Sequence, residues 1–121
     1  MEIKRLGAIE SRFADIIWER APLSSPELVR LSSERLGWKK STTYTVLKRL
    51  CGCGLFENDG GTVRVRMTRE EYDSAQSALF VNEAFSGSLP AFFAAFTAGK
   101  PLTAQEAEEI RRMIDAYRQE G

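Results

Sequence analysis

The stretch STTYTVLKRL, residues 41–50, predicts a short helix with two chemically different sides. At 100° per residue, one side is suited to a core and carries Thr43, Val46, Leu47 and Leu50. The other side offers hydroxyl groups and cations, which suit base edges and phosphates in a DNA groove; it carries Ser41, Tyr44, Thr45 and Lys48, with Thr42 and Arg49 at its flanks. An ordinary amphipathic helix with a solvated polar face has the same pattern, so this helix alone leaves both interpretations open.

A β-hairpin is predicted after Gly54, which we expect to end the helix. Its turn is the sequence Asn-Asp-Gly-Gly at residues 58–61, which has apolar residues on both sides. On the return strand, we expect Val63, Val65 and Met67 to cover the core while Thr62, Arg64 and Arg66 face outward. Charges on an edge strand also prevent unwanted pairing. A polar-faced helix followed by an arginine-bearing hairpin is nevertheless more specific than either part and predicts a winged helix-turn-helix, whose wing binds phosphates.

The remaining elements are predicted to be helices. A first helix carries Leu6, Ile9, Phe13, Ile16 and Ile17 and ends before Pro22, and a capping motif at residues 24–27 opens a second helix that ends at Gly37. Leu23 is expected to add a short strand beside the hairpin. Capping motifs at Thr68 and Thr103, and a phenylalanine-rich segment from residue 89 to 99, predict three further helices. The predicted fold is mainly α with a small β-hairpin wing: a winged-helix DNA-binding domain over residues 1–69 and a helical dimerisation domain over residues 70–121.

Charge is divided between these two halves, although the chain of 121 residues has no net charge. Residues 1–69 hold 13 basic and 8 acidic side chains, whereas residues 70–121 hold 4 basic and 9 acidic ones. A solvated surface can vary in charge by chance, but a change of sign at the end of the hairpin favours a division of labour. The expected DNA-binding residues are Lys39, Lys40, Ser41, Thr42, Tyr44, Thr45, Lys48, Arg49, Arg64 and Arg66.

The tail is small for an independent core, yet five of the seven phenylalanines lie between residues 80 and 96. A symmetric partner would cover these side chains and would present two recognition helices to a palindromic site. The expected homodimer interface contains Leu79, Phe80, Phe85, Leu89, Phe92, Phe93, Phe96, Ile110, Met113, Ile114 and Tyr117. A monomer whose tail folds back on its first half remains an alternative.

Other classes of protein are not favoured. No apolar run approaches the roughly 18 residues that span a bilayer, and no secretion signal is recognisable, so a cytoplasmic location without membrane contact is expected. The chain contains no His and no phosphate-binding glycine loop, so we expect neither an enzyme nor a cofactor. Cys51 and Cys53 lie about 200° apart on a helix and fall short of a four-ligand metal site unless a partner chain supplies the other ligands. Reduced structural thiols are therefore expected, and redox or metal sensing is the alternative.

Several of these motifs together resemble the penicillinase repressor family of bacterial winged-helix regulators. They are Ile16-Ile17-Trp18, Gly37-Trp38, residues 42–50, Gly54 and a tail pattern that includes Phe85, Gly87-Ser88-Leu89, Phe96, Leu102-Thr103, Glu106, Glu109-Ile110 and Ile114. The resemblance implies a homodimeric transcriptional repressor that binds an inverted-repeat operator. It also implies DNA contacts through Ser41, Thr42, Tyr44 and Thr45, with the basic residues of the wing on phosphates.

Three departures from that family limit what the resemblance implies. The β-lactam-responsive repressors carry basic residues where this chain has Ser41 and Tyr44, so their operator sequence is not carried over. Leu79-Phe80 replaces their Asn-Phe cleavage pair, which puts a regulatory protease in doubt. The copper-responsive relatives bind metal through tail cysteines, and this tail has none. A winged helix that binds another protein instead of DNA remains the alternative function.

Overall fold

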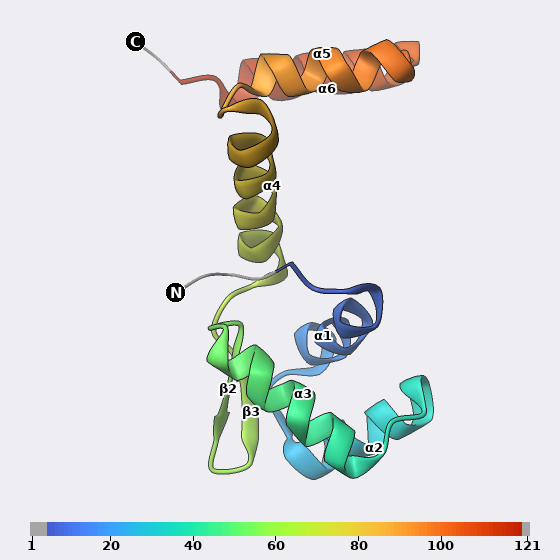
Figure 1. The fold of residues 1–121 in the computed structure, drawn as a ribbon, viewed down its shortest axis with the longest axis vertical. Helices are drawn as coiled ribbons and strands as arrows, with labels where there is room; N and C mark the ends of the chain where they lie inside the picture. The colour runs from blue at the N-terminus through green and yellow to red at the C-terminus, as the bar shows by residue number, and fades with distance from the viewer. Residues whose placement is uncertain (1–4, 120–121) are drawn as a thin grey trace. The chain divides into compact units, whose positions relative to one another are not determined.

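The computed structural model describes residues 5–119. The chain divides into two compact units between Leu79 and Phe80. In chain order the elements are α1 (Ala8–Arg20), β1 (Leu23–Ser24), α2 (Ser25–Leu36), α3 (Lys40–Gly52), β2 (Phe56–Asp59), β3 (Thr62–Val65), α4 (Arg69–Phe85), α5 (Leu89–Gly99) and α6 (Ala104–Tyr117) (Figure 1). This order of three helices, a hairpin and three further helices confirms the predicted fold class.

Local capping fixes both ends of α2, the helix that precedes α3. The Ser24 hydroxyl accepts a hydrogen bond from the Glu27 backbone N–H at 3.2 Å and thereby caps α2. The carboxylate of Glu27 forms an ion pair with Arg30 instead of completing the reciprocal half of the motif. The helix ends at Gly37, whose φ of 70° is a left-handed conformation that glycine adopts without steric cost. The sequence Gly37-Trp38-Lys39 can therefore turn the chain into α3.

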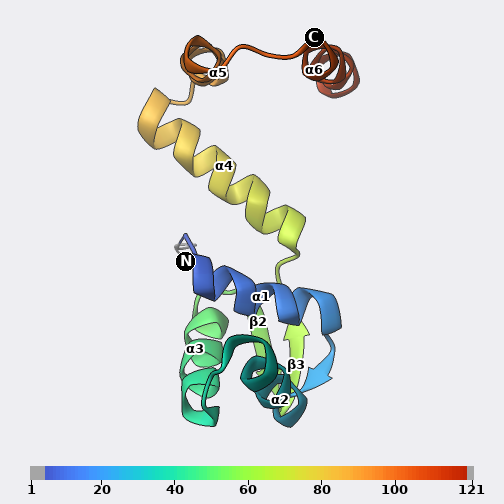
Figure 2. The ribbon, with the colours of Figure 1, turned by 90° about the vertical axis from the view of Figure 1, so that its right-hand side faces the viewer.

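The wing belongs to a three-stranded antiparallel sheet with the order β1-β3-β2. Asp59 pairs with Thr62 across the turn, and Gly60 and Gly61 adopt φ values of 59° and 95° between them, as a two-residue hairpin turn requires. Leu23 pairs with Val63, which confirms the expected short strand beside the hairpin. In Figure 2 the helices α1, α2 and α3 lie with this sheet in one unit.

The core of the first unit is a single apolar cluster. It contains Phe13, Ala14, Ile16, Ile17, Leu23, Leu28, Leu31, Val46, Leu47, Leu50, Leu55, Phe56, Val63 and Tyr72. Two expectations about this core are wrong. Ile9 is 50% exposed because it lies in the first turn of α1, ahead of the buried part of that helix, and Val65 is 36% exposed because it lines an open cavity beyond the covered part of the sheet.

Tyr72 ties the start of α4 to the winged helix. Its side chain is 8% exposed, its ring lies 5.8 Å from that of Trp18, and its hydroxyl accepts a hydrogen bond from the Leu6 backbone N–H at 2.9 Å. The boundary between the compact units lies inside α4. The charge distribution instead predicts a domain boundary between residues 69 and 70. The division of labour between DNA binding and dimerisation stays a prediction.

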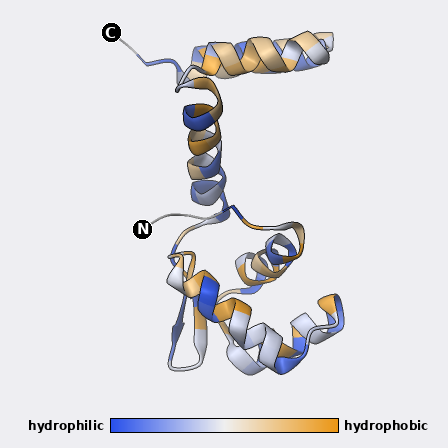
Figure 3. Ribbon diagram, viewed as in Figure 1, coloured by the Kyte–Doolittle hydropathy of each residue, from blue (hydrophilic) through white to orange (hydrophobic). Residues whose placement is uncertain are grey.

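The second unit leaves its apolar side chains largely uncovered. The rings of Phe80, Phe85 and Phe92 contact one another, with centroid separations of 5.6–6.0 Å, but neither α5 nor α6 contains a buried residue. Figure 2 shows α5 and α6 end on and apart, and Figure 3 shows apolar residues along α5. The second unit therefore does not bury its own apolar faces.

The apolar residues of the second unit do not form a single membrane-spanning helix among the described residues. Among the described residues no single helix is long and apolar enough to cross a bilayer; only α4 and α5 taken together have the required length and composition, and they are bent by 84° where they meet.

Candidate nucleic-acid interface

Helix α3 has one buried side and one solvent-facing side. Thr43, Val46, Leu47 and Leu50 are at most 8% exposed, as predicted from their spacing. On the opposite side, Ser41, Thr42, Thr45 and Lys48 are exposed. The Thr45 hydroxyl donates to the Ser41 carbonyl oxygen at 2.9 Å, which leaves its lone pairs and its methyl group available to a partner. The exposed side can therefore accept hydrogen bonds and contact a thymine methyl group.

Tyr44 differs from the other residues expected on this face because it is half-buried and packs against the core cluster. Its hydroxyl bonds to the Ser25 hydroxyl at 3.2 Å, and the Ser25 backbone N–H donates to the Gly61 carbonyl oxygen at 2.8 Å. Through Ser25, Tyr44 thus links α3 to the turn of the hairpin. No sequence pattern indicated Ser25 as the partner of Tyr44, because Ser25 lies inside a capping motif that explains it locally.

Three lysines around α3 carry positive charge that no acidic side chain of residues 5–119 compensates. Lys39 and Lys40 lie at the N-terminal end of α3 and Lys48 lies in its third turn, and all three are exposed. None of them forms an ion pair with another residue in the range 5–119. Unpaired ammonium groups beside exposed hydroxyls suit a polyanionic partner such as DNA.

The arginines expected at this surface are all engaged by carboxylates. Arg49 forms an ion pair with Glu10 of α1, whereas Arg64 and Arg66 reach Asp59 and Glu57 across the hairpin, each at 3.8 Å. The arginine side chains in these three pairs are 49–62% exposed. Exposed ion pairs of this kind contribute only about 0–1 kcal/mol, so a phosphate can replace the carboxylate.

The hairpin and α3 lie next to each other in the first unit (Figure 1). The fold therefore brings the hydroxyl groups of α3, the lysines around it and the arginines of the wing into one region of the unit. Sequence reasoning missed the residues that position this region, Ser25 and Glu10, because both act across elements.

The two cysteines lie at the end of α3 and are partly buried and unpaired. Burial raises the pKa of the Cys51 thiol, so it is protonated and weakly reactive at neutral pH. Within the part of the chain that the structure describes, no group of three or more potential metal ligands comes together. The candidate interface therefore presents hydroxyl, ammonium and guanidinium groups, and its guanidinium groups are paired with carboxylates.

Comparison with known proteins agrees with this geometry. The sequence profile of the penicillinase repressor family matches residues 6–116, which include both compact units. A search of curated individual proteins gives no match. With its winged helix, its exposed polar face on α3 and a family match along nearly its whole length, the chain belongs to the penicillinase repressor family of DNA-binding transcriptional repressors.

Proposed function

We propose that this chain is a homodimeric repressor that inserts α3 into the major groove of an inverted-repeat operator. The observation that carries the proposal is the polar face of α3, where exposed hydroxyls lie beside Lys39, Lys40 and Lys48 and no carboxylate pairs with those lysines among the described residues. As a family member it acts as a regulator and not as an enzyme. Its proposed location is the cytoplasm, because that is where a bacterial operator is found.

The proposed contacts divide by chemistry. Ser41, Thr42 and Thr45 contact base edges, since hydroxyl groups accept and donate hydrogen bonds there. The three lysines, together with Arg49, Arg64 and Arg66, contact phosphates after the arginines release their exposed carboxylate partners. Tyr44 takes a positioning role, because its hydroxyl is bonded to Ser25.

Dimerisation is proposed through the second unit. Its large apolar side chains are exposed to a degree unusual for a monomer: Leu89 is 63% exposed, Phe96 is 54% exposed and Ile114 is 59% exposed. A second copy of the same unit offers the same apolar surface, so a two-fold interface covers both. The proposed interface keeps the residues expected from the sequence: Leu79, Phe80, Phe85, Leu89, Phe92, Phe93, Phe96, Ile110, Met113, Ile114 and Tyr117.

The test is fluorescence anisotropy of a labelled duplex spanning the gene's own upstream region, titrated with protein across a salt series beside a scrambled duplex. We expect selective binding at two chains per site, with an affinity that falls steeply as salt rises, because phosphate contacts release counterions. Weak binding that does not distinguish the two duplexes would contradict the proposal and favour a winged helix that binds another protein.

A further inference from the structure

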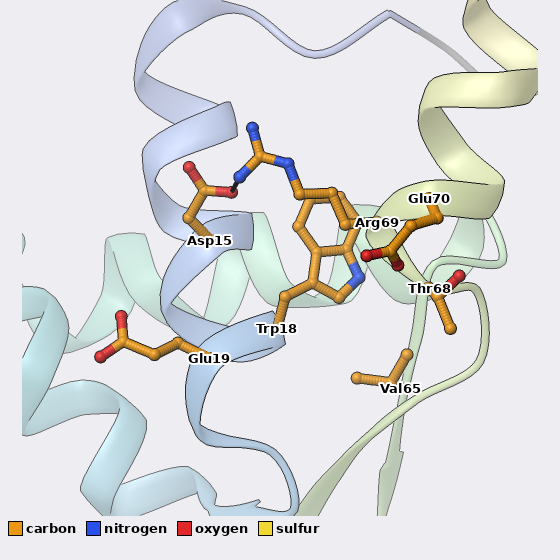
Figure 4. A pocket seen from close by; sticks show the side chains of 7 residues that line it. All are labelled: Asp15, Trp18, Glu19, Val65, Thr68, Arg69 and Glu70. Carbon is orange, nitrogen blue, oxygen red and sulfur yellow. Dashed lines mark hydrogen bonds and ion pairs between the residues drawn. The ribbon is translucent and has the colours of Figure 1, made fainter. Parts of the chain in front are cut away.

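A cavity of about 650 Å³ opens in the first unit between α1, the end of β3 and the first turn of α4 (Figure 4). Its lining combines the half-buried indole of Trp18 and the exposed side chain of Val65 with carboxylates from both helices. None of its residues belongs to the proposed DNA-binding face or to the proposed dimer interface. The DNA-binding proposal therefore leaves the cavity without a role.

One wall of this cavity already holds a cation of the chain itself. The Arg69 guanidinium forms an ion pair with Asp15 and lies 5.9 Å from the centroid of the Trp18 ring (Figure 4). A guanidinium over an aromatic face is attracted by the ring quadrupole, most strongly by that of Trp. The wall is thus suited to a positive charge next to an apolar surface.

The cavity also contains negative charge that the chain does not neutralise. Its lining has three carboxylates, Asp15, Glu19 and Glu70, against the single cation Arg69. Glu19 is held by Arg35 of α2 at 3.3 Å and points away from the indole. Glu70 lies beside the indole in Figure 4 and forms no ion pair with any residue in the described range. An anionic ligand is disfavoured there, whereas a cation gains a partner.

We propose that this cavity binds a small organic cation, an amine or amidine that carries a flat apolar body. The body contacts Trp18 and Val65, and the positive group lies at the carboxylate of Glu70. The cavity volume falls within the range of known small-molecule sites, which have apolar walls and a few polar groups that fix orientation. Such a ligand contacts the last residue of the wing strand and the first turn of α4 at once.

The test compares three probes that share a phenyl ring and differ in charge: phenethylammonium, 2-phenylethanol and 3-phenylpropionate. The protein is labelled with 5-fluorotryptophan, and its two ¹⁹F resonances are assigned with Trp38→Phe. We expect phenethylammonium alone to shift the Trp18 resonance in a saturable way. An absence of saturation, or the same response to all three probes, would overturn the proposal.

Two matched variants locate the binding group. Glu70→Gln is expected to weaken phenethylammonium binding about fivefold, as the loss of a partly exposed ion pair implies. Glu83→Gln changes another exposed carboxylate of α4 that has no ion pair among the described residues, and it should leave the affinity unchanged. Equal affinities for Glu70→Gln and the original chain would also refute the site. The titration uses the protein without DNA, so its outcome is independent of operator binding.

Discussion

Replacing Tyr44 with Phe tests whether its hydroxyl positions the recognition helix or contacts DNA. The substitution keeps the ring, which packs on the core, and removes the 3.2 Å hydrogen bond to Ser25. Ser25 is 7% exposed, so its hydroxyl loses a partner that water cannot fully replace. A side-chain hydrogen bond of this kind contributes about 0.5–1.5 kcal/mol, and we therefore expect Tyr44→Phe to lower the free energy of unfolding by about 1 kcal/mol.

Urea unfolding followed by circular dichroism measures this change, and anisotropy with operator and scrambled duplexes measures selectivity. Ser25→Ala and the double variant complete a mutant cycle, in which the two losses should not add because the residues share one bond. The reasoning is refuted if Tyr44→Phe unfolds like the original chain but loses discrimination between the two duplexes. That result would place the hydroxyl at a base edge.

Further predictions concern five individual side chains. Thr45→Ala should weaken operator binding more than random-duplex binding, and equal losses in the anisotropy assay would show that Thr45 does not contact a base edge. Arg66→Ala should weaken binding to both duplexes and reduce the slope of log affinity against log salt concentration by about one. Phe93→Asp should yield insoluble protein, or monomers in sedimentation velocity, because Phe93 is 40% exposed in one chain and an unpaired charge is costly in an apolar interface. A soluble dimer of unchanged affinity would place the interface elsewhere. Ser32→Ala should not destabilise the fold in urea, since its buried hydroxyl has no hydrogen-bond partner in the described part of the chain; a loss near 1 kcal/mol would show that it has one. The pKa of the Glu106 carboxyl lies below its ordinary value of 4.5, because the backbone N–H and the hydroxyl of Thr103 bond to the carboxylate. The contribution of Glu106 to stability is therefore present above pH 4.5 and is lost as the pH falls below that value. The unfolding midpoints of Glu106→Gln and the original chain should differ at neutral pH and converge in acid.

Local motifs explain why much of the fold could be predicted from the sequence. The caps at Thr68 and Thr103 form within four residues, and both reciprocal hydrogen bonds occur as predicted. The alternation along β3 failed at Val65, because period two assigns a face of the strand but does not say where the elements that cover this face end. Likewise, Ile9 has helical spacing but lies in the first turn of α1, ahead of the buried part of that helix.

The candidate site could likewise be predicted only where local sequence patterns determine it. The exposed hydroxyls of α3 followed from its own periodicity, whereas the bond between Tyr44 and Ser25 and the pair between Arg49 and Glu10 join residues 19 and 39 positions apart. No local pattern encodes such contacts. They depend on how α2 and α1 pack against α3, which the sequence alone did not predict.

These tertiary contacts narrow the surface that can distinguish one operator from another. With Tyr44 bonded to Ser25, and with Arg49 proposed to contact a phosphate, the groups left for base edges are mainly the hydroxyls of α3. A hydroxyl bonds to several bases, whereas strong discrimination comes from bidentate groups such as the Arg fork or the Asn amide. We therefore expect one copy of α3 to supply modest selectivity. In the dimer proposed above, two copies of α3 would multiply that selectivity over two half-sites. On this proposal the exposed apolar faces of α5 and α6 and the hydroxyl face of α3 serve the same recognition.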